Sequence, residues 1–174
     1  MNHGNWGYGL FEGSTEDDIA TDYLRRRRRG LSPEAAAQKV YDFCLAQKPS
    51  RRSAYDRVNR ETHLSFAQAK LARWRDLQAL YLVTLAAIQI VRHELTPAWC
   101  ALARQAIEAA RIGDRLLWAL STENVVPAPE VAIDPARQGV ISSFYELLRT
   151  FDNTQPFTPE TLPPYLAGGE VSET

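Results

Sequence analysis

The chain has 174 residues, of which 45% are hydrophobic and 24% are charged, and its formal net charge is −1. These values are typical of one globular domain with a substantial core, and they exclude an intrinsically disordered chain. A net charge close to zero creates no overall field that would draw the protein to nucleic acid or to an anionic membrane. We therefore expect a single domain over residues 1–174.

The charges are unevenly distributed along the chain. Residues 1–24 contain five acids and no lysine or arginine, whereas residues 25–75 contain fourteen basic residues and four acids. The remaining residues contain six basic residues and twelve acids. Segregation of this kind predicts local surfaces of opposite sign, which matter more for the choice of a partner than the total charge does.

The cysteines and the apolar segments bear on the location of the protein. Cys44 and Cys100 are far apart and fall in apolar helical patterns, which is typical of small buried hydrophobic residues. The N-terminus shows no secretory signal, so we expect a reducing, cytoplasmic location. The longest apolar stretch, residues 77–91, contains three polar residues and is too short to cross a membrane.

Residues 1–13 are predicted to form an irregular N-terminal arm. In the stretch "WGYGLFEG" large apolar side chains alternate with glycines, which allow the backbone to bend tightly. Leaving the rings of Trp6, Tyr8 and Phe11 in water is unfavourable. We therefore expect these three residues to act as structural anchors that seal one end of the fold.

The first helix is predicted to begin at Ser14 or Thr15 and to end near Arg29, with Gly30 as a natural stop. Acidic residues come first and arginines follow, which is the order that the helix dipole favours. The five consecutive arginines, residues 25–29, turn by about 100° each around a helix. They therefore encircle the helix and cannot all face one phosphate backbone.

The second helix is predicted to begin after Ser32, with Pro33 at its first position. Its apolar residues recur at helical spacing and define one face, which we expect to be buried. These residues are Ala36, Val40, Phe43 and Cys44. Residues 48–62 are polar and basic, and we interpret them as a long connection with room for one helical turn.

The third helix is predicted over about residues 65–95, with a nearly all-apolar section that indicates neighbours on several sides. Thr96 and Pro97 then begin a fourth helix that ends near Gly113, followed by a short continuation, "DRLLWAL". Residues 121–134 are interpreted as a loop.

The last helix is predicted from Pro135 to about Thr150 or Phe151. Four prolines interrupt the extended tail, residues 152–174, and exclude a regular helix there. Apolar side chains in the tail are expected to hold it against the other helices: Phe157, Leu162, Tyr165 and Leu166. No segment shows strand alternation and no repeat is apparent, so the sequence predicts an all-α bundle of about five main helices.

Familiar catalytic and metal-binding motifs do not occur in the sequence. His3, His63 and His93 form no H-x-x-x-H pair, and two separated cysteines do not make a structural zinc site. The sequence contains no P-loop, no G-x-S-x-G and no complete dinucleotide fingerprint. We therefore expect no metal and no cofactor, and a protein that is not an enzyme. An enzyme with an unrecognised site is kept as an alternative.

Candidate partner-binding residues lie along the first helix. An acidic group suits a basic partner, since complementary charge raises association rate and specificity. This group comprises Glu16, Asp17, Asp18 and Asp22. A basic group, Arg25, Arg26 and Arg29, suits an acidic partner instead. The acids lack the spacing of a calcium-binding loop.

Nucleic acid is disfavoured as a partner, but a nucleic-acid-associated or regulatory protein using residues 25–29 and 51–60 is the main alternative.

The stretch "WGYGLFEGSTEDDIATDY", followed by "GLSPEAAAQKVYDF", resembles a group of small bacterial proteins of unknown function. Their N-terminus reads W-G-x-G-x-F, then an acidic residue and a D-rich helix start. A later stretch, "ALYLVTLAAIQIVRHELTPAWCALARQAIE", is similar to their third element, so that the resemblance covers roughly residues 5–47 and 77–120. Such families often look like immunity partners of polymorphic bacterial toxins. The resemblance therefore implies an immunity protein that neutralises a cognate toxin by occluding its active site, and it leaves homodimerisation open.

Overall fold

The computed structural model describes residues 10–11, 14–48, 60–111, 135–151, 153–154, 157–158 and 160–166. These ranges contain five α-helices and one short 3₁₀ helix: α1 (Ser14–Arg28), α2 (Pro33–Ala46), α3 (Arg60–Val91), α4 (Pro97–Arg111), α6 (Pro135–Thr150) and η1 (Pro164–Leu166). The described residues include no strand, and the predicted all-α bundle is confirmed. Among the helices of these ranges, none has the length and apolar character needed to span a membrane.

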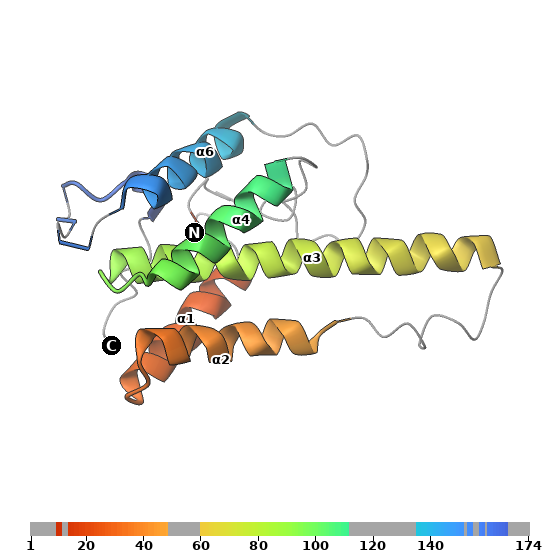
Figure 1. Cartoon of the computed structure of the whole chain (residues 1–174), viewed down its shortest axis with the longest axis horizontal. Coiled ribbons are helices and arrows are strands. Elements are labelled where there is room, and N and C mark those ends of the chain that lie inside the picture. Colours follow the sequence, from red (N-terminus) through yellow and green to blue (C-terminus); the bar gives the residue numbers. More distant parts are fainter. Residues whose placement is uncertain are drawn as a thin grey trace, which may run out of the picture.

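The helix α3 is the centre of the fold. In Figure 1, α1 and α2 lie on one side of α3, while α4 and α6 lie on the other. α1, α2, α4 and η1 each pack directly against α3, and α6 packs on α4. All residues from Leu80 to Ile90 are accordingly buried, which confirms the prediction that this section of the helix has neighbours on several sides.

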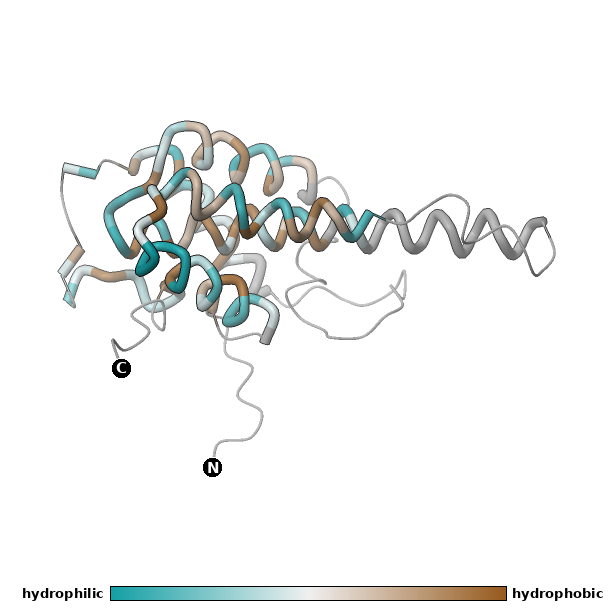
Figure 2. The backbone as a smooth tube through the Cα atoms, turned by 90° about the horizontal axis from the view of Figure 1, so that it is seen from below, coloured by the Kyte–Doolittle hydropathy of each residue, from teal (hydrophilic) through white to brown (hydrophobic). Residues whose placement is uncertain are grey.

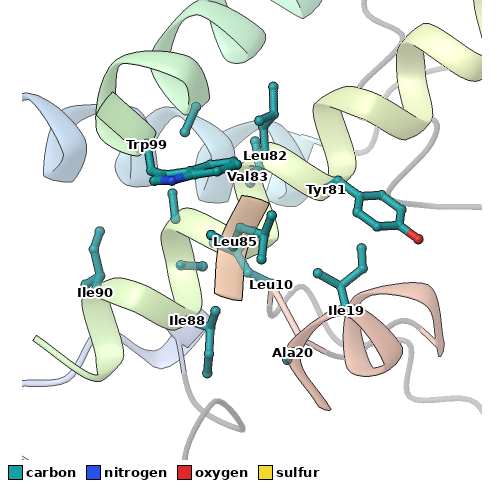
Figure 3. Packing of buried hydrophobic residues seen from close by; sticks show 14 of the residues in the cluster. Leu10, Ile19, Ala20, Tyr81, Leu82, Val83, Leu85, Ile88, Ile90 and Trp99 are labelled. Atoms are coloured by element: carbon teal, nitrogen blue, oxygen red, sulfur yellow. The ribbon is translucent and has the colours of Figure 1, made fainter. Parts of the chain in front are cut away.

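One cluster of buried side chains joins the helices. It includes Ile19 of α1, Leu85 of α3, Trp99 of α4 and Phe144 of α6. Figure 3 shows side chains from α1, α3 and α4 gathered in this cluster, with Leu10 of the N-terminal segment among them. Hydrophobic and hydrophilic positions alternate around the helical turns in Figure 2, as expected for helices with one face turned to a core.

The connection between α1 and α2 follows the predicted chemistry. Gly30 has a φ of +92°, a left-handed conformation that residues with a side chain rarely adopt. The hydroxyl of Ser32 accepts a hydrogen bond from the backbone N–H of Ala35 at 3.2 Å, and Pro33 occupies the first helical position. These contacts confirm the predicted stop of the first helix and the predicted start of the second.

The ends of α3 differ from the prediction. The helix begins at Arg60, inside the basic segment interpreted as a connection, and it ends at Val91 rather than near residue 95. The chain leaves the helical path at His93, which has a φ of +56°. This turn brings the side chain of Glu94 back toward α1, where it forms long-range contacts that local sequence does not encode.

Phe43 is also placed differently from the prediction. Ala36, Val40 and Cys44 form the buried face of α2 as expected, but the side chain of Phe43 is 63% exposed. The three buried residues follow one another at four-residue steps and share one stripe of the helix. Phe43 is turned from Cys44 by about 100° and lies at the flank of that stripe.

The N-terminal segment and the tail meet. The backbone N–H of Leu10 donates a hydrogen bond to the carbonyl of Tyr165 at 2.8 Å. Phe11 is buried as predicted, whereas Trp6 and Tyr8 lie outside the described residues. Leu166 is buried, and the other predicted contacts of the tail are partly buried against the core: Phe157, Leu162 and Tyr165. The described part of the tail is therefore held against the helices, as predicted.

The predicted continuation at 114–120 and the predicted loop at 121–134 lie outside the described residues.

Candidate partner-binding surface

The helix α1 has one buried face and one face that is exposed to solvent. Its buried side consists of Ile19, Ala20, Tyr23 and Leu24, each at most 6% exposed. These residues follow a spacing of three and four, which places them on one face that packs against α2 and α3. The candidate binding residues must therefore be sorted by their position relative to this face.

Glu16 does not belong to the exposed acidic group in which it was expected. Its side chain is 3% exposed, although it belongs to the first turn of the helix. The reason is its spacing, because Glu16 lies three residues before Ile19 and seven before Tyr23, on the buried face. A partner approaching α1 from solvent therefore does not reach this carboxylate.

Asp22 is neutralised within its own helix. Its carboxylate forms ion pairs with Arg25 at three residues' distance and with Arg26 at four, the latter with an Nε–Oδ2 distance of 3.2 Å. Asp22 and Arg26 lie four residues apart, the spacing at which oppositely charged side chains meet on one side of a helix. One acid and two arginines of the candidate set compensate one another, which weakens the field that each presents to a partner.

Arg27, which was not among the candidate residues, makes the principal long-range ion pair of α1. Its Nη2 lies 2.8 Å from Oε2 of Glu94, and its Nε donates to both oxygens of the same carboxylate. The hydroxyl of Tyr23 donates to Glu94 Oε1 at 2.7 Å, and Arg92 Nε donates to that oxygen at 3.1 Å. The sequence could have indicated that Arg27 faces the core, since it lies four residues after Tyr23 on the buried face.

The pKa values in this network follow from its geometry. Burial alone would raise the pKa of Glu94, but hydrogen bonds from Arg27 and Tyr23 and the charges of Arg27 and Arg92 outweigh burial and lower it. The pKa of Tyr23 is raised, first by burial and then by its hydrogen bond to Glu94. Glu94 is therefore a carboxylate and Tyr23 a neutral donor at neutral pH, so that the network holds α1 against the turn after α3.

Asp17 and Asp18 are the acids that face solvent. Both side chains are exposed, and neither forms an ion pair with any residue of the described ranges. At the opposite end of α1, Arg28 and Arg29 are exposed in the same way. Among the residues that the structure describes, two acids at the start of α1 and two arginines at its end thus have no ion-pair partner.

The acidic end of α1 adjoins the end of α2. Figure 3 shows the hydroxyl of Tyr81 turned away from the core beside Ile19 of α1. Burial raises the pKa of Tyr81, and the charges of Asp22 and Asp18 raise it further, while a hydrogen bond with Gln47 lowers it. The Tyr81 ring therefore lies near both α1 and the C-terminal end of α2.

In the described part of the molecule, burial makes the two cysteine thiols less reactive. Burial raises the pKa of the Cys44 thiol to about 11 and raises that of Cys100 as well. Cys100 Sγ donates to the carbonyl of Leu148 at 3.2 Å, between α4 and α6. Within the described ranges, no group of three or more His, Cys, Asp and Glu side chains is arranged to hold a metal ion.

Comparison with known proteins adds no relative: the chain matches no protein-family model, no curated protein and no solved structure.

Proposed function

We propose that this chain is an immunity protein, which binds one cognate bacterial toxin in the cytoplasm and blocks its active site. The observation that carries the proposal is the pair Asp17 and Asp18. These two exposed acids have no ion-pair partner in the described part of the chain, and they project from a helix whose other face is buried. A charged surface on a fixed support is the feature that an inhibitor of a cationic cleft requires.

The anchoring of α1 makes these acids effective. Tyr23 and Arg27 tie the helix to Glu94, so the backbone that carries Asp17 and Asp18 needs little reordering when a partner binds. The acids also lie at the N-terminus of the helix, where the dipole stabilises negative charge. Their exposure is therefore compatible with a stable fold.

The partner that best suits this surface is a toxin that acts on nucleic acid or nucleotides. Enzymes of that kind present cationic clefts to phosphate groups, and carboxylates can occupy such a cleft in place of phosphate. Charge complementarity of this kind accelerates association, while apolar anchors around it slow dissociation. The resemblance of the N-terminal segment to proteins that look like immunity partners supports the same role.

Co-expression tests the proposal. Each reading frame adjacent to the gene is expressed alone and together with this chain in a bacterial host. We expect one frame to stop growth and this chain to restore it. A growth-inhibiting neighbour that this chain fails to neutralise would contradict the proposal, and so would a set of neighbours that are all harmless.

Stoichiometry separates inhibition from catalysis. An inhibitor that occludes an active site acts at one molecule per toxin, so a titration should reach full inhibition at equimolar chain. An enzyme that modifies the toxin would act at far lower ratios and leave the toxin inactive after separation. Equimolar inhibition that is reversed when the complex is dissociated is the result that the proposal requires.

A further inference from the structure

The outer face of α2 is an unpartnered surface. Ala35, Lys39, Asp42, Phe43 and Ala46 are all exposed, and they follow one another at the spacing of a single helical stripe. Phe43 is 63% exposed, the largest exposure among the large hydrophobic side chains of the described residues. The stripe therefore combines an aromatic ring with one positive and one negative charge.

The charges of this stripe are not paired with each other. Asp42 accepts a hydrogen bond from Gln38 Nε2 at 2.8 Å, and this neutral donor does not cancel the charge of the carboxylate. Neither Lys39 nor Asp42 forms an ion pair with another described residue. Both are exposed, so each is free to pair with a group on another molecule.

The stripe is self-complementary about a point between residues 40 and 41. Lys39 and Asp42 lie at equal distances on either side of this point, and so do Ala35 and Ala46. When a second copy of α2 lies antiparallel across a two-fold axis through this point, Lys39 faces Asp42 of the second copy, and the reverse pair forms by symmetry. The small Ala35 faces Ala46 of the second copy, which allows the two helices to approach closely.

The same symmetry provides a place for the aromatic ring. Phe43 follows Lys39 by one turn, on the same flank of the stripe. A two-fold axis perpendicular to the plane of both helices keeps this flank on the same side in each copy. The two Phe43 rings then lie about 7–8 Å apart along the helix axis, each beside the aliphatic stem of Lys39 of the second copy. Two exposed rings and two lysine stems would leave water together.

We propose that α2 mediates a two-fold symmetric dimer contact between two copies of this chain. The 14-residue helix is about 21 Å long, and one helix of that length covers less than the roughly 800 Å² per partner of a stable interface. The dimer is therefore weak and reversible. This contact does not depend on the proposed immunity function, because it uses α2 and needs no toxin.

Analytical ultracentrifugation of the purified full-length chain tests the contact. The mass should rise from 19.6 kDa toward twice that value as the protein concentration increases through the micromolar range. Phe43→Ala should raise the dissociation constant of the dimer about tenfold. Leu102→Ala, at a 37% exposed leucine on α4, is the matched control and should leave self-association unchanged.

Exchange of the two charges tests the symmetry itself. Lys39→Asp places two acids opposite each other and Asp42→Lys places two cations opposite each other, so each variant alone should be monomeric. A mixture of the two variants should associate, since every facing pair is then of opposite sign, and the double variant should recover self-association. Circular dichroism checks that all variants are folded. A wild-type protein that stays at the monomer mass throughout, or a mixture that does not associate, would overturn the proposal.

Discussion

Arg27 and Glu94, which are 67 residues apart in the chain, form a partly buried ion pair with an Nη2–Oε2 distance of 2.8 Å. Tyr23 donates a hydrogen bond to the same carboxylate. Together these contacts connect the C-terminal half of α1 to the turn between α3 and α4. The helix that presents Asp17 and Asp18 to solvent is thereby fixed at its other end, so the candidate binding surface depends on an interaction outside it.

Removal of Arg27 should weaken the fold. Arg27→Ala leaves the Glu94 carboxylate without its main partner in a partly buried position, and we expect a loss of about 1–3 kcal/mol in the free energy of unfolding. Urea unfolding measures this loss. Arg28→Ala is the matched control, because Arg28 is exposed, and its effect should stay within about 0.5 kcal/mol. Equal effects of the two substitutions would show that the ion pair does not anchor α1.

Acid should release this anchor. The network lowers the pKa of Glu94 below its ordinary value of 4.5, so the folded state holds the carboxylate in its charged form. A group with a lowered pKa contributes stability above its ordinary pKa and loses that contribution as the pH falls through the lowered value. The difference in unfolding free energy between wild type and Glu94→Gln should therefore shrink between about pH 5 and about pH 3. A difference that is constant over this range would contradict the pKa assignment.

The attachment of the tail should contribute to stability. Leu166 of η1 is fully buried, and η1 packs on α3. Leu166→Ala should destabilise the protein by about 2–5 kcal/mol in thermal or urea unfolding. The same substitution at the exposed Leu102 should cost less than about 1 kcal/mol. A similar loss at both positions would mean that the tail does not belong to the core.

The sequence predicted most reliably those structural features that depend only on residues close together in the chain. Gly30, Ser32 and Pro33 each act on the backbone within a few positions, so the turn between the first two helices was predictable. The end of α3 was not, because the left-handed turn that follows the helix is made by His93 and not by a glycine that would have marked it in the sequence. The basic start of α3 at Arg60 lacks the apolar periodicity on which the prediction relied.

The sequence predicted which charged residues make up the candidate site, but it predicted only in part which of them face solvent. The acids and arginines of α1 look equivalent in the sequence, but in the structure some of them lie on the buried face of the helix and others face solvent. Glu16 and Arg27 fall on the face of Ile19 and Tyr23, while Asp17 and Asp18 fall outside it. Extending the apolar spacing to the charged residues of the same helix would have separated the two groups. The exposure of Phe43 does not follow from this rule, since Phe43 lies seven residues after the buried Ala36 and only about 20° from it around the helix.

Nucleic acid should bind weakly. Three of the five consecutive arginines are engaged in ion pairs, since Arg25 and Arg26 contact Asp22 and Arg27 contacts Glu94. Within residues 25–29, this leaves Arg28 and Arg29 without an ion pair to a described residue, and two cations neutralise few phosphates, so we expect binding to labelled duplex DNA or RNA to be lost near about 150 mM salt. Fluorescence anisotropy over a salt series measures this. Submicromolar affinity at about 150 mM salt would favour a nucleic-acid-associated protein over an immunity protein.

Reversal of the acidic pair is the most direct test of the binding surface. In the variant Asp17→Lys/Asp18→Lys the exposed start of α1 becomes positive, at a cost of some tenths of a kcal/mol per site through the helix dipole. The variant Arg28→Glu/Arg29→Glu at the other end of the same helix is the matched control. Circular dichroism and urea unfolding establish that both variants are folded before kinetics are compared.

The decisive measurement is the stopped-flow association rate with the toxin that co-expression identifies. For wild type the rate should fall steeply with salt, because attraction between the acids and a cationic cleft accelerates the encounter. The acidic-pair variant should associate about tenfold more slowly at low salt and with less salt dependence, whereas the arginine variant should associate at least as fast as wild type. An unchanged association rate in the folded acidic-pair variant would contradict the assignment of Asp17 and Asp18 to the toxin-binding surface.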